Sequence, residues 1–335
     1  GICPWNFPFF VMARKVAPSL VTGNTCVIKP SCIAPNTIME FTKLIENIGL
    51  PAGVLNFVCG SGTVVGNALT KSPITGIVSL TGSVFAGQKI MEAAAANITK
   101  VSLELGGKAP AIVCADANLD IAVNAIVSSK VIFSGQVCNC AERVYVEDSI
   151  YDRFMEKVTK KMSEVKVEDA FSENNPDMSS MVSKDQVDKV AEMVEFAKKE
   201  GAEVLVGGNR SEQFDKGYFY QPTLLTNVKQ NMQIIQEEVF GPVLPVMKFG
   251  TLDEAIALAN DCEYGLTSSI FSEDFNKVMH ASNELQFGET YINREHFEAI
   301  QGFHAGWKKS GLGGADGKHG MEEYLQTKVV YAQYR

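Results

Sequence analysis

Short apolar segments alternate with helix-like segments from the start of the chain, and this alternation restricts the fold more than any other feature. The segments typical of buried strands are 25–30, 53–60, 75–82 and 100–105. The helix-like segments between them are 36–49, 63–71 and 85–97. Strands that alternate with helices form parallel sheets covered by helices on both faces. We therefore predict an α/β fold with a doubly wound parallel sheet, whose ligands bind beyond the carboxyl ends of its strands.

The alternation continues with longer connections after residue 109. The expected strands are 110–115, 142–148, 267–271 and 289–293. The expected helices are 118–132, 150–165, 184–200, 252–260 and 274–285. We also expect a hairpin-like region at 217–226, a glycine-rich loop at 301–320 and a last strand at 327–335. Because 335 residues exceed what one hydrophobic core usually serves, two domains are expected.

The composition excludes several classes of protein. The chain is 46% hydrophobic and 21% charged, which is typical of a soluble globular protein. Its net charge of −9 argues against binding to nucleic acid, because no basic surface is expected. We see no apolar run of the roughly 18–20 residues that cross a bilayer and no signal peptide. The chain does not begin with Met, so we expect it to start partway through a longer protein.

The cysteines point to a reducing compartment. Eight cysteines lie at irregular intervals, without a Cys-x-x-Cys pair, and only four histidines are present. A zinc site therefore has little support, and we predict no metal. A disulfide framework is not expected in a chain of this size, so most cysteines should be buried thiols in a cytoplasmic protein.

Four polar motifs stand at turns or strand ends where chemistry could take place. Cys138 follows a Gly-Gln turn in "FSGQVCNC" and is either a nucleophile or a buried thiol. Glu104 precedes a glycine pair and is either a general base or a surface carboxylate. Asn6, between prolines, could donate to an oxyanion, and Gly82 opens a turn that suits a phosphate. Each motif alone also fits a purely structural role.

Taken together and in order, these motifs resemble the aldehyde dehydrogenase superfamily over essentially the whole chain. The motifs are Pro-Trp-Asn-Phe-Pro, Lys-Pro-Ser, Thr-Gly-Ser, Glu-Leu-Gly-Gly-Lys, Gly-Gln-Val-Cys, Glu-Glu-Val-Phe-Gly-Pro, Tyr-Gly-Leu and Lys-x-Ser-Gly-x-Gly. The runs "GICPWNFPFF" and "SGQVCNCAERVYV" are similar to the branch that oxidises lactaldehyde and glycolaldehyde. The resemblance implies a Rossmann-like dinucleotide-binding domain at 1–107 and an α/β catalytic domain at 108–311. Residues 312–335 would return to the first domain and supply a strand for homo-oligomers, as dimers or tetramers.

The resemblance also implies a mechanism. Cys138 would attack the aldehyde carbon, a hydride would pass to the nicotinamide, and Glu104 would activate the water that hydrolyses the thioester. The Asn6 side chain and the Cys138 N–H would hold the oxyanion, with Lys15 near the catalytic water. The product would be a carboxylic acid.

The cofactor and substrate residues follow from the same resemblance. The cofactor would be NAD, and the residues expected to bind it are Lys29, Gly82, Ser83, Glu238 and Phe240. Lys29 and Glu238 would bind the adenosine ribose and the nicotinamide ribose, and Phe240 would pack by the nicotinamide. The candidates for gripping a small hydroxyaldehyde are Asn139, Glu298 and His304.

The sequence departs from the family pattern at several positions. Cys32 stands where a glutamate usually favours NAD, which leaves NADP open as a cofactor. Phe133 replaces an asparagine before the nucleophile, and Gly313-Gly314-Ala315 replaces Gly-Arg-Glu. Lys318 stands where many members have a second glutamate. The family also carries a long segment before Pro-Trp-Asn, so we expect an N-terminally truncated chain.

Three other interpretations remain open at this point. The chain could be a catalytically inactive fragment that serves as a scaffold or cofactor-binding subunit, as the truncation and Phe133 suggest. It could transfer the acyl group to coenzyme A, although Glu104 argues against that. It could be a hydrolytic Cys-His enzyme, although the histidines lie far downstream of Cys138.

Overall fold

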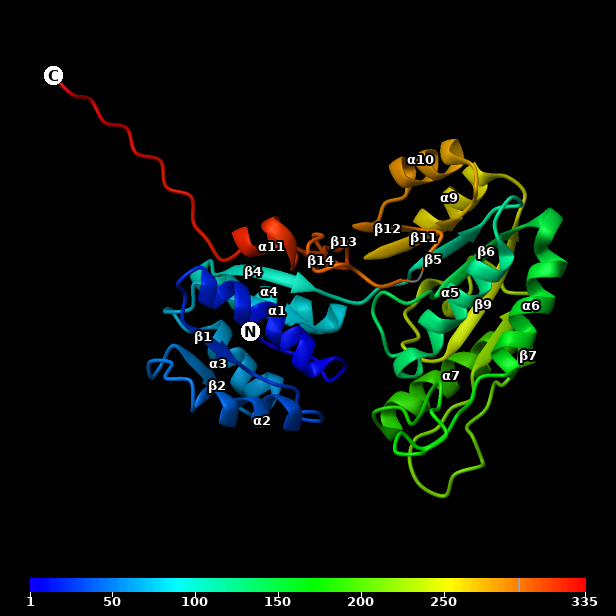
Figure 1. Cartoon of the computed structure of the whole chain (residues 1–335), viewed down its shortest axis with the longest axis horizontal. Coiled ribbons are helices and arrows are strands. Elements are labelled where there is room, and N and C mark those ends of the chain that lie inside the picture. Colours follow the sequence, from blue (N-terminus) through cyan, green and yellow to red (C-terminus); the bar gives the residue numbers. More distant parts are fainter. Residues whose placement is uncertain (295) are drawn as a thin grey trace. The chain divides into compact units, whose positions relative to one another are not determined.

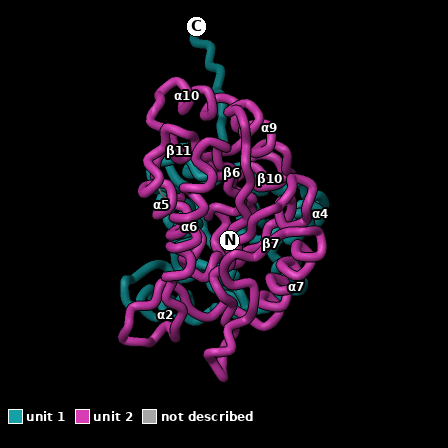
Figure 2. Tube along the Cα trace, turned by 90° about the vertical axis from the view of Figure 1, so that its right-hand side faces the viewer, with its two compact units in different colours: residues 1–105, 298–305, 311–335 teal, residues 106–297, 306–310 magenta. Residues whose placement is uncertain are grey.

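The computed structural model describes residues 1–294 and 296–335, and these divide into two compact units (Figures 1 and 2). Unit 1 consists of Gly1–Leu105, Glu298–Ala305 and Gly311–Arg335. Unit 2 consists of Gly106–Phe297 and Gly306–Ser310. Residues 298–305, which the sequence assigned to the catalytic domain, therefore pack with the first part of the chain.

Unit 1 is built on short parallel strands. Its strands are β1 (Cys26–Ile28), β2 (Leu55–Phe57), β3 (Ile77–Thr81), β4 (Lys100–Glu104) and β14 (Gly311–Leu312). β1 pairs with β2 and β3 with β4, both in parallel, while β14 runs antiparallel to β4. Ile2 forms parallel bridges to Lys29 and to Leu80. The N-terminal residues thus join the two small sheets of this unit.

Helices cover the strands of unit 1. They are α1 (Pro8–Val21), α2 (Asn36–Ile45), α3 (Asn67–Thr70), α4 (Val84–Ala94) and α11 (Gly317–Glu322). Met12 of α1, Ile38 of α2 and Ile28 of β1 share one core cluster and are fully buried. Burial of each such side chain stabilises the fold by about 1.5–3 kcal/mol.

Unit 2 contains a seven-stranded sheet in the order β12-β11-β5-β6-β9-β8-β7. Its strands are β5 (Pro110–Val113), β6 (Arg143–Glu147), β7 (Glu203–Val206), β8 (Thr223–Thr226), β9 (Val243–Phe249), β11 (Thr267–Phe271) and β12 (Glu289–Ile292). Neighbouring strands are parallel except β7 and β8. β10 (Tyr264–Gly265) pairs antiparallel with β13 (Trp307–Lys308) outside this sheet.

Alternate residues of these strands enter two separate cores on the two faces of the sheet. Val144 and Val146 of β6 lie in the cluster with α5 (Leu119–Val131) and α6 (Tyr151–Ser163). Tyr145, between them, lies in the cluster with α9 (Leu252–Asn260) and α10 (Phe275–Glu284). The remaining helices of unit 2 are α7 (Lys184–Glu200) and α8 (Gln233–Gln236). In the part of the chain that is described, none of the helices combines the length and apolarity that a membrane span requires.

The predicted α/β class with parallel strands is confirmed, and the structure differs from the expectations in three local details. The helix expected at 63–71 begins as a π-helical turn at Gly62–Gly66, because glycines at both ends weaken a regular helix. The loop expected at 301–320 contains β13, β14 and α11. The last strand does not form within this chain: residues 325–335 are exposed and have no regular structure, and their expected role in homo-oligomers stays a prediction. A strand needs a neighbour for its backbone hydrogen bonds, and none lies beside this tail among the described residues.

Replacing Ile98 should stabilise unit 1. Ile98 ends the 3₁₀ turn after α4 in the left-handed region, with φ of 54°, and is 94% exposed. A β-branched residue is strained there, whereas glycine is not. Ile98→Gly is therefore expected to raise the free energy of unfolding by about 0.5–1 kcal/mol in a denaturant titration. Ile74→Gly is the matched control: Ile74 is also exposed but has no positive φ, so this change should destabilise. Equal effects of both substitutions would contradict the strain at Ile98.

Candidate active site

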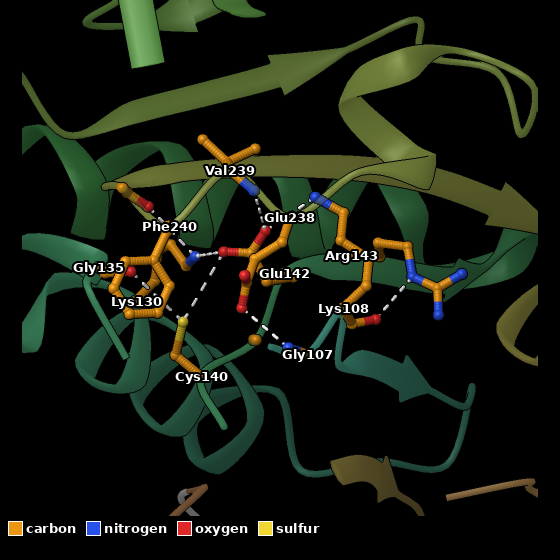
Figure 3. A network of polar contacts seen from close by, with 12 residues as sticks. Gly107, Lys108, Lys130, Gly135, Cys140, Glu142, Arg143, Glu238, Val239 and Phe240 are labelled. Carbon is orange, nitrogen blue, oxygen red and sulfur yellow. Dashed lines mark hydrogen bonds and ion pairs between the residues drawn. The ribbon is translucent and has the colours of Figure 1, made fainter. Parts of the chain in front are cut away.

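Two glycines allow three segments of unit 2 to approach one another. A Cβ atom on Gly107 would collide with the carbonyl oxygen of Cys138, and one on Gly106 would collide with the carboxylate of Glu238. The Gly107 N–H donates to Glu238 Oε1 at 2.8 Å (Figure 3). The glycine pair of "ELGGK" thus brings the segment of Cys138 and the carboxylate of Glu238 to the same place.

The loop that carries Cys138 has an unusual backbone. Phe133, Ser134 and Gly135 all adopt positive φ, directly after α5 ends. A side chain on Gly135 would collide with the backbone of Gly241. The Gln136 side chain donates to the Phe133 carbonyl at 2.8 Å and accepts from the Val182 N–H at 3.0 Å. Strained residues held by such contacts are typical of functional sites.

The two cysteines of this loop differ in their surroundings. Cys138 is partly exposed, whereas Cys140 is fully buried and directed at the Gly135 carbonyl oxygen. Burial raises the pKa of the Cys140 thiol to about 12, so it is neutral at pH 7. A neutral, buried thiol is a poor nucleophile, which leaves Cys138 as the candidate of the pair.

Asn139 and Phe240 lie on the segments that meet at the glycine pair. Asn139 is buried, and its carbonyl accepts a hydrogen bond from Thr267 Oγ1 at 3.2 Å. Phe240 follows Glu238 with φ of 56°, and its carbonyl accepts from Gln186 Nε2 at 2.9 Å. Both residues are therefore held through their backbone carbonyls.

Glu238 should make the stability of the protein depend on pH. Burial and then the charge of Glu142 raise the pKa of Glu238 from 4.5 to about 7. When the pKa of a carboxyl group is higher in the folded than in the unfolded state, the folded protein loses stability as pH rises from the unfolded-state pKa to the folded-state pKa. Glu238→Gln removes this penalty. Its free energy of unfolding, relative to wild type, should therefore rise by about 1–3 kcal/mol between pH 5 and pH 8 in denaturant titrations. The exposed neighbour Glu237 provides the control Glu237→Gln, which should show no such growth.

In unit 1, the candidate base lies at the end of a parallel strand. Glu104 is the last residue of β4 and is only 4% exposed. His304 Nε2 lies 3.4 Å from Glu104 Oε2, and both side chains are buried. The structure therefore brings together two residues that the sequence suggested for different roles, at the carboxyl end of the sheet where ligands usually bind.

Lys15 and Asn6 belong to the start of unit 1. Lys15, on α1, is buried and donates from Nζ to Ser79 Oγ at 2.8 Å. Burial lowers the pKa of Lys15. Asn6 lies in the bend before α1, next to Phe7 with φ of 49°.

Three of the residues expected at a dinucleotide, Lys29, Gly82 and Ser83, also lie at strand ends of unit 1. Lys29 follows β1 and donates to the carbonyls of Pro30 at 2.6 Å and Gly60 at 3.1 Å. Cys32, the departure from the family pattern, donates to the same Gly60 carbonyl at 3.1 Å. Gly82 and Ser83 connect β3 to α4, and the Ser83 hydroxyl caps that helix by accepting from the Ala86 N–H. The first turn of such a helix offers N–H groups to phosphate oxygens.

Sequence reasoning missed Arg14. Its guanidinium Nη1 lies 3.3 Å from Glu298 Oε1, it also pairs with Asp316, and it stacks over the Phe10 ring at 4.7 Å. Arg14 and Glu298 are 284 residues apart, so no local motif links them. The one available signal was a pair of basic residues, Arg14 and Lys15, inside an otherwise apolar helix.

The predicted residues fall into two groups by unit. Unit 1 holds Asn6, Lys15, Lys29, Gly82, Ser83, Glu104, Glu298 and His304. Unit 2 holds Cys138, Asn139, Glu238 and Phe240. Their roles in catalysis and binding stay predictions.

The fold and these motifs define a class of enzyme: the chain belongs to the aldehyde dehydrogenase family, which it matches over residues 1–330. It is therefore an oxidoreductase, and the resemblance inferred from the motifs is confirmed. It is 58% identical to lactaldehyde dehydrogenase of Escherichia coli, over 99% of this chain and 69% of that protein. The crystal structure of lactaldehyde dehydrogenase from Escherichia coli superposes with a TM-score of 0.98, over 100% of this chain and 70% of that one.

The names of two further relatives include a cofactor. A D-glyceraldehyde dehydrogenase (NADP(+)) of Picrophilus torridus is 40% identical, over 100% of this chain and 68% of that protein. The structure of betaine aldehyde dehydrogenase from Staphylococcus aureus in complex with NAD+ is 39% identical, with a TM-score of 0.95. That match covers 98% of this chain and 65% of the other.

Proposed function

We propose that this protein oxidises small hydroxyaldehydes, such as lactaldehyde or glycolaldehyde, to carboxylic acids with NAD as the hydride acceptor. The observation that carries the proposal is the convergence of the Cys138 loop and Glu238 on the glycine pair Gly106–Gly107. In support, the backbone of Cys138, whose thiol is partly exposed, and the partly buried Glu238 carboxylate both approach this glycine pair. The identity of 58% to lactaldehyde dehydrogenase supports the choice of substrate.

The mechanism uses residues of this chain for every step except the redox step. The Cys138 thiolate forms a bond to the aldehyde carbon, and the resulting oxyanion accepts hydrogen bonds from the Asn6 amide and the Cys138 N–H. Lys29, Ser83 and Glu238 would hold the dinucleotide, which would supply the hydride acceptor that turns this adduct into a thioester. Glu104 then takes a proton from water, which attacks the thioester and releases the acid and the Cys138 thiol. Lys15, whose Nζ donates to Ser79 Oγ, would lie near this water.

The residues present fit a dinucleotide. Lys29 and the N-terminal turn of α4, after Gly82 and Ser83, offer donors to ribose and phosphate groups. Glu238 would accept from the nicotinamide ribose, and Phe240 would pack against the nicotinamide. Cys32 carries no charge to repel a 2′-phosphate, so NADP should also be accepted.

A hydroxyl group beside the aldehyde would be recognised by polar side chains. In unit 1, the Glu298 carboxylate, which pairs with Arg14, offers an acceptor, and His304 offers a donor. In unit 2, Asn139 offers an amide. The protein should work in a reducing compartment such as the cytoplasm, as a homo-oligomer. In support, all eight cysteines, which lie within the described residues, are free thiols.

The test is the formation of reduced nicotinamide by this chain, followed by absorbance. L-lactaldehyde and glycolaldehyde should be oxidised with a kcat/KM about tenfold or more above propionaldehyde, which lacks the hydroxyl group. NAD and NADP are each tested as acceptor, and added coenzyme A should not raise the rate. Dinucleotide binding without turnover of any aldehyde would overturn the proposal in favour of an inactive cofactor-binding subunit.

A further inference from the structure

A fully buried carboxylate, Glu142, lies just beyond the candidate nucleophile loop, directly before β6 (Figure 3). Its Oε1 atom accepts from Lys130 Nζ at 2.6 Å. Its Oε2 atom accepts from Lys108 Nζ at 2.8 Å and from the Val239 N–H at 3.1 Å. One side chain thus joins three separate segments of unit 2.

Each of these three segments leads to a residue of the proposed site. Lys108 directly follows Gly107, which contacts both Glu238 and the backbone of Cys138. Val239 directly follows Glu238. The Glu142 carboxylate therefore fixes the chain on both sides of the contact between Gly107 and Glu238.

The third segment is the end of α5, where the nucleophile loop begins. Lys130 lies in the last turn of this helix, and besides Glu142 it donates to the Gly241 carbonyl at 3.2 Å. Gly241 is the residue whose backbone a side chain at Gly135 would strike. Lys130 thus ties the start of the Cys138 loop to the segment that follows Phe240.

Glu142 and Lys130 are charged at neutral pH, whereas burial lowers the pKa of Lys108. Burial opposes the charge of Glu142, but Lys108 and Lys130 outweigh it and lower its pKa to about 2. Burial also opposes the charge of Lys130, but the charge and hydrogen bond of Glu142 help raise its pKa to about 12, so Lys130 keeps its proton. Buried ion pairs often add little stability over apolar side chains of the same size, but they demand one geometry. A geometric role is therefore the better explanation of this cluster.

We propose that Glu142 is a positioning residue for aldehyde oxidation, which holds the loop of Cys138 and the cofactor carboxylate Glu238 in register. It touches neither substrate nor cofactor and acts through Lys108, Lys130 and the Val239 N–H. The inference rests on the proposed function, because it takes Cys138 as the nucleophile and Glu238 as the cofactor ligand.

The experiment compares wild type with Glu142→Gln, Lys130→Met and the double variant. Glu142→Gln leaves two buried ammonium groups without a carboxylate, so it should lower the melting temperature as well as disturb the site. The double variant removes one lysine together with the carboxylate, so fewer buried amino groups are left without their partner. It should recover most of the melting temperature without restoring the tie between the segments.

Two measurements then report on the cofactor residues and on Cys138 without depending on turnover. One is the Kd for NADH and for NADPH, from fluorescence titration. The other is the rate at which iodoacetamide alkylates Cys138 in the protein without dinucleotide, followed by peptide mass spectrometry. Glu142→Gln and the double variant should both weaken dinucleotide binding about tenfold and change the alkylation rate at least about threefold. Lys130→Met should change the Kd and the alkylation rate in the same direction. It replaces Glu142→Gln in the comparison if that variant does not fold.

The control is Lys157→Met, which breaks an exposed pair with Asp120 between α6 and α5 and should leave all readouts unchanged. A double variant that regains wild-type Kd and alkylation rate together with its melting temperature would overturn the proposal, because Glu142 would then serve stability alone. Unchanged readouts in Glu142→Gln would overturn it too. Wild type that binds no dinucleotide would instead count against the proposed function, and the alkylation rate would still decide the role of Glu142.

Discussion

Cys138→Ala is expected to lower the formation of reduced nicotinamide by about 10³-fold or more, to background, while dinucleotide binding survives. The thiol forms the covalent bond to the aldehyde, and alanine offers no group that could replace it. Cys138 is only partly buried, so the smaller side chain should leave the fold intact. Steady-state absorbance measures the turnover, and fluorescence titration with NADH measures the binding.

Cys140→Ala is the matched control for this experiment. Cys140 stands two residues further on, but burial raises the pKa of its thiol to about 12. The variant should therefore keep its turnover within about tenfold of wild type. Turnover that persists in Cys138→Ala and disappears in Cys140→Ala would exchange the roles of the two cysteines.

The sequence predicted well those features that depend on residues close together in the chain. The alternation of apolar strands and amphipathic helices depends on spacings of two to four residues, so β3, β4, β5 and β11 appear where expected. The glycine pair Gly106–Gly107 was visible as a motif. Its reason became clear only in the structure, where both glycines permit close approach of distant segments.

Contacts between distant residues could not be predicted in this way. Nothing near Glu298 in the sequence indicates Arg14, which lies 284 residues away. Charged residues are usually exposed, and nothing near Lys108, Lys130 and Glu142 in the sequence indicates that they are buried. They can be buried because the Glu142 carboxylate pairs with both lysines, and that compensation exists only in the folded chain.

The backbone conformation of the nucleophile loop could also be predicted only in part. Gly135 signals a turn, but Phe133 and Ser134 carry no such signal, because neither residue favours a positive φ. The last eleven residues show the opposite error. Their apolar and aromatic side chains favour a strand, but strand propensity acts only where a partner is present.

Glu104→Gln is expected to separate the two halves of the reaction. The amide keeps the size of the side chain at the end of β4 but cannot take a proton from water. Cys138 should still be acylated, so each active site should release one burst of NADH in a stopped-flow experiment. Steady-state turnover should then fall by about 10²–10⁴-fold, because the thioester waits for hydrolysis.

Glu323→Gln controls for the loss of a carboxylate near the same strand. Glu323 pairs with Lys100 at the opposite end of β4, so this change should alter neither the burst nor the steady state. If the burst vanishes together with turnover in Glu104→Gln, Glu104 acts before the thioester forms, as the base that deprotonates Cys138. If the steady state is unchanged, another group activates the water, and His304, 3.4 Å from Glu104, becomes the first residue to replace.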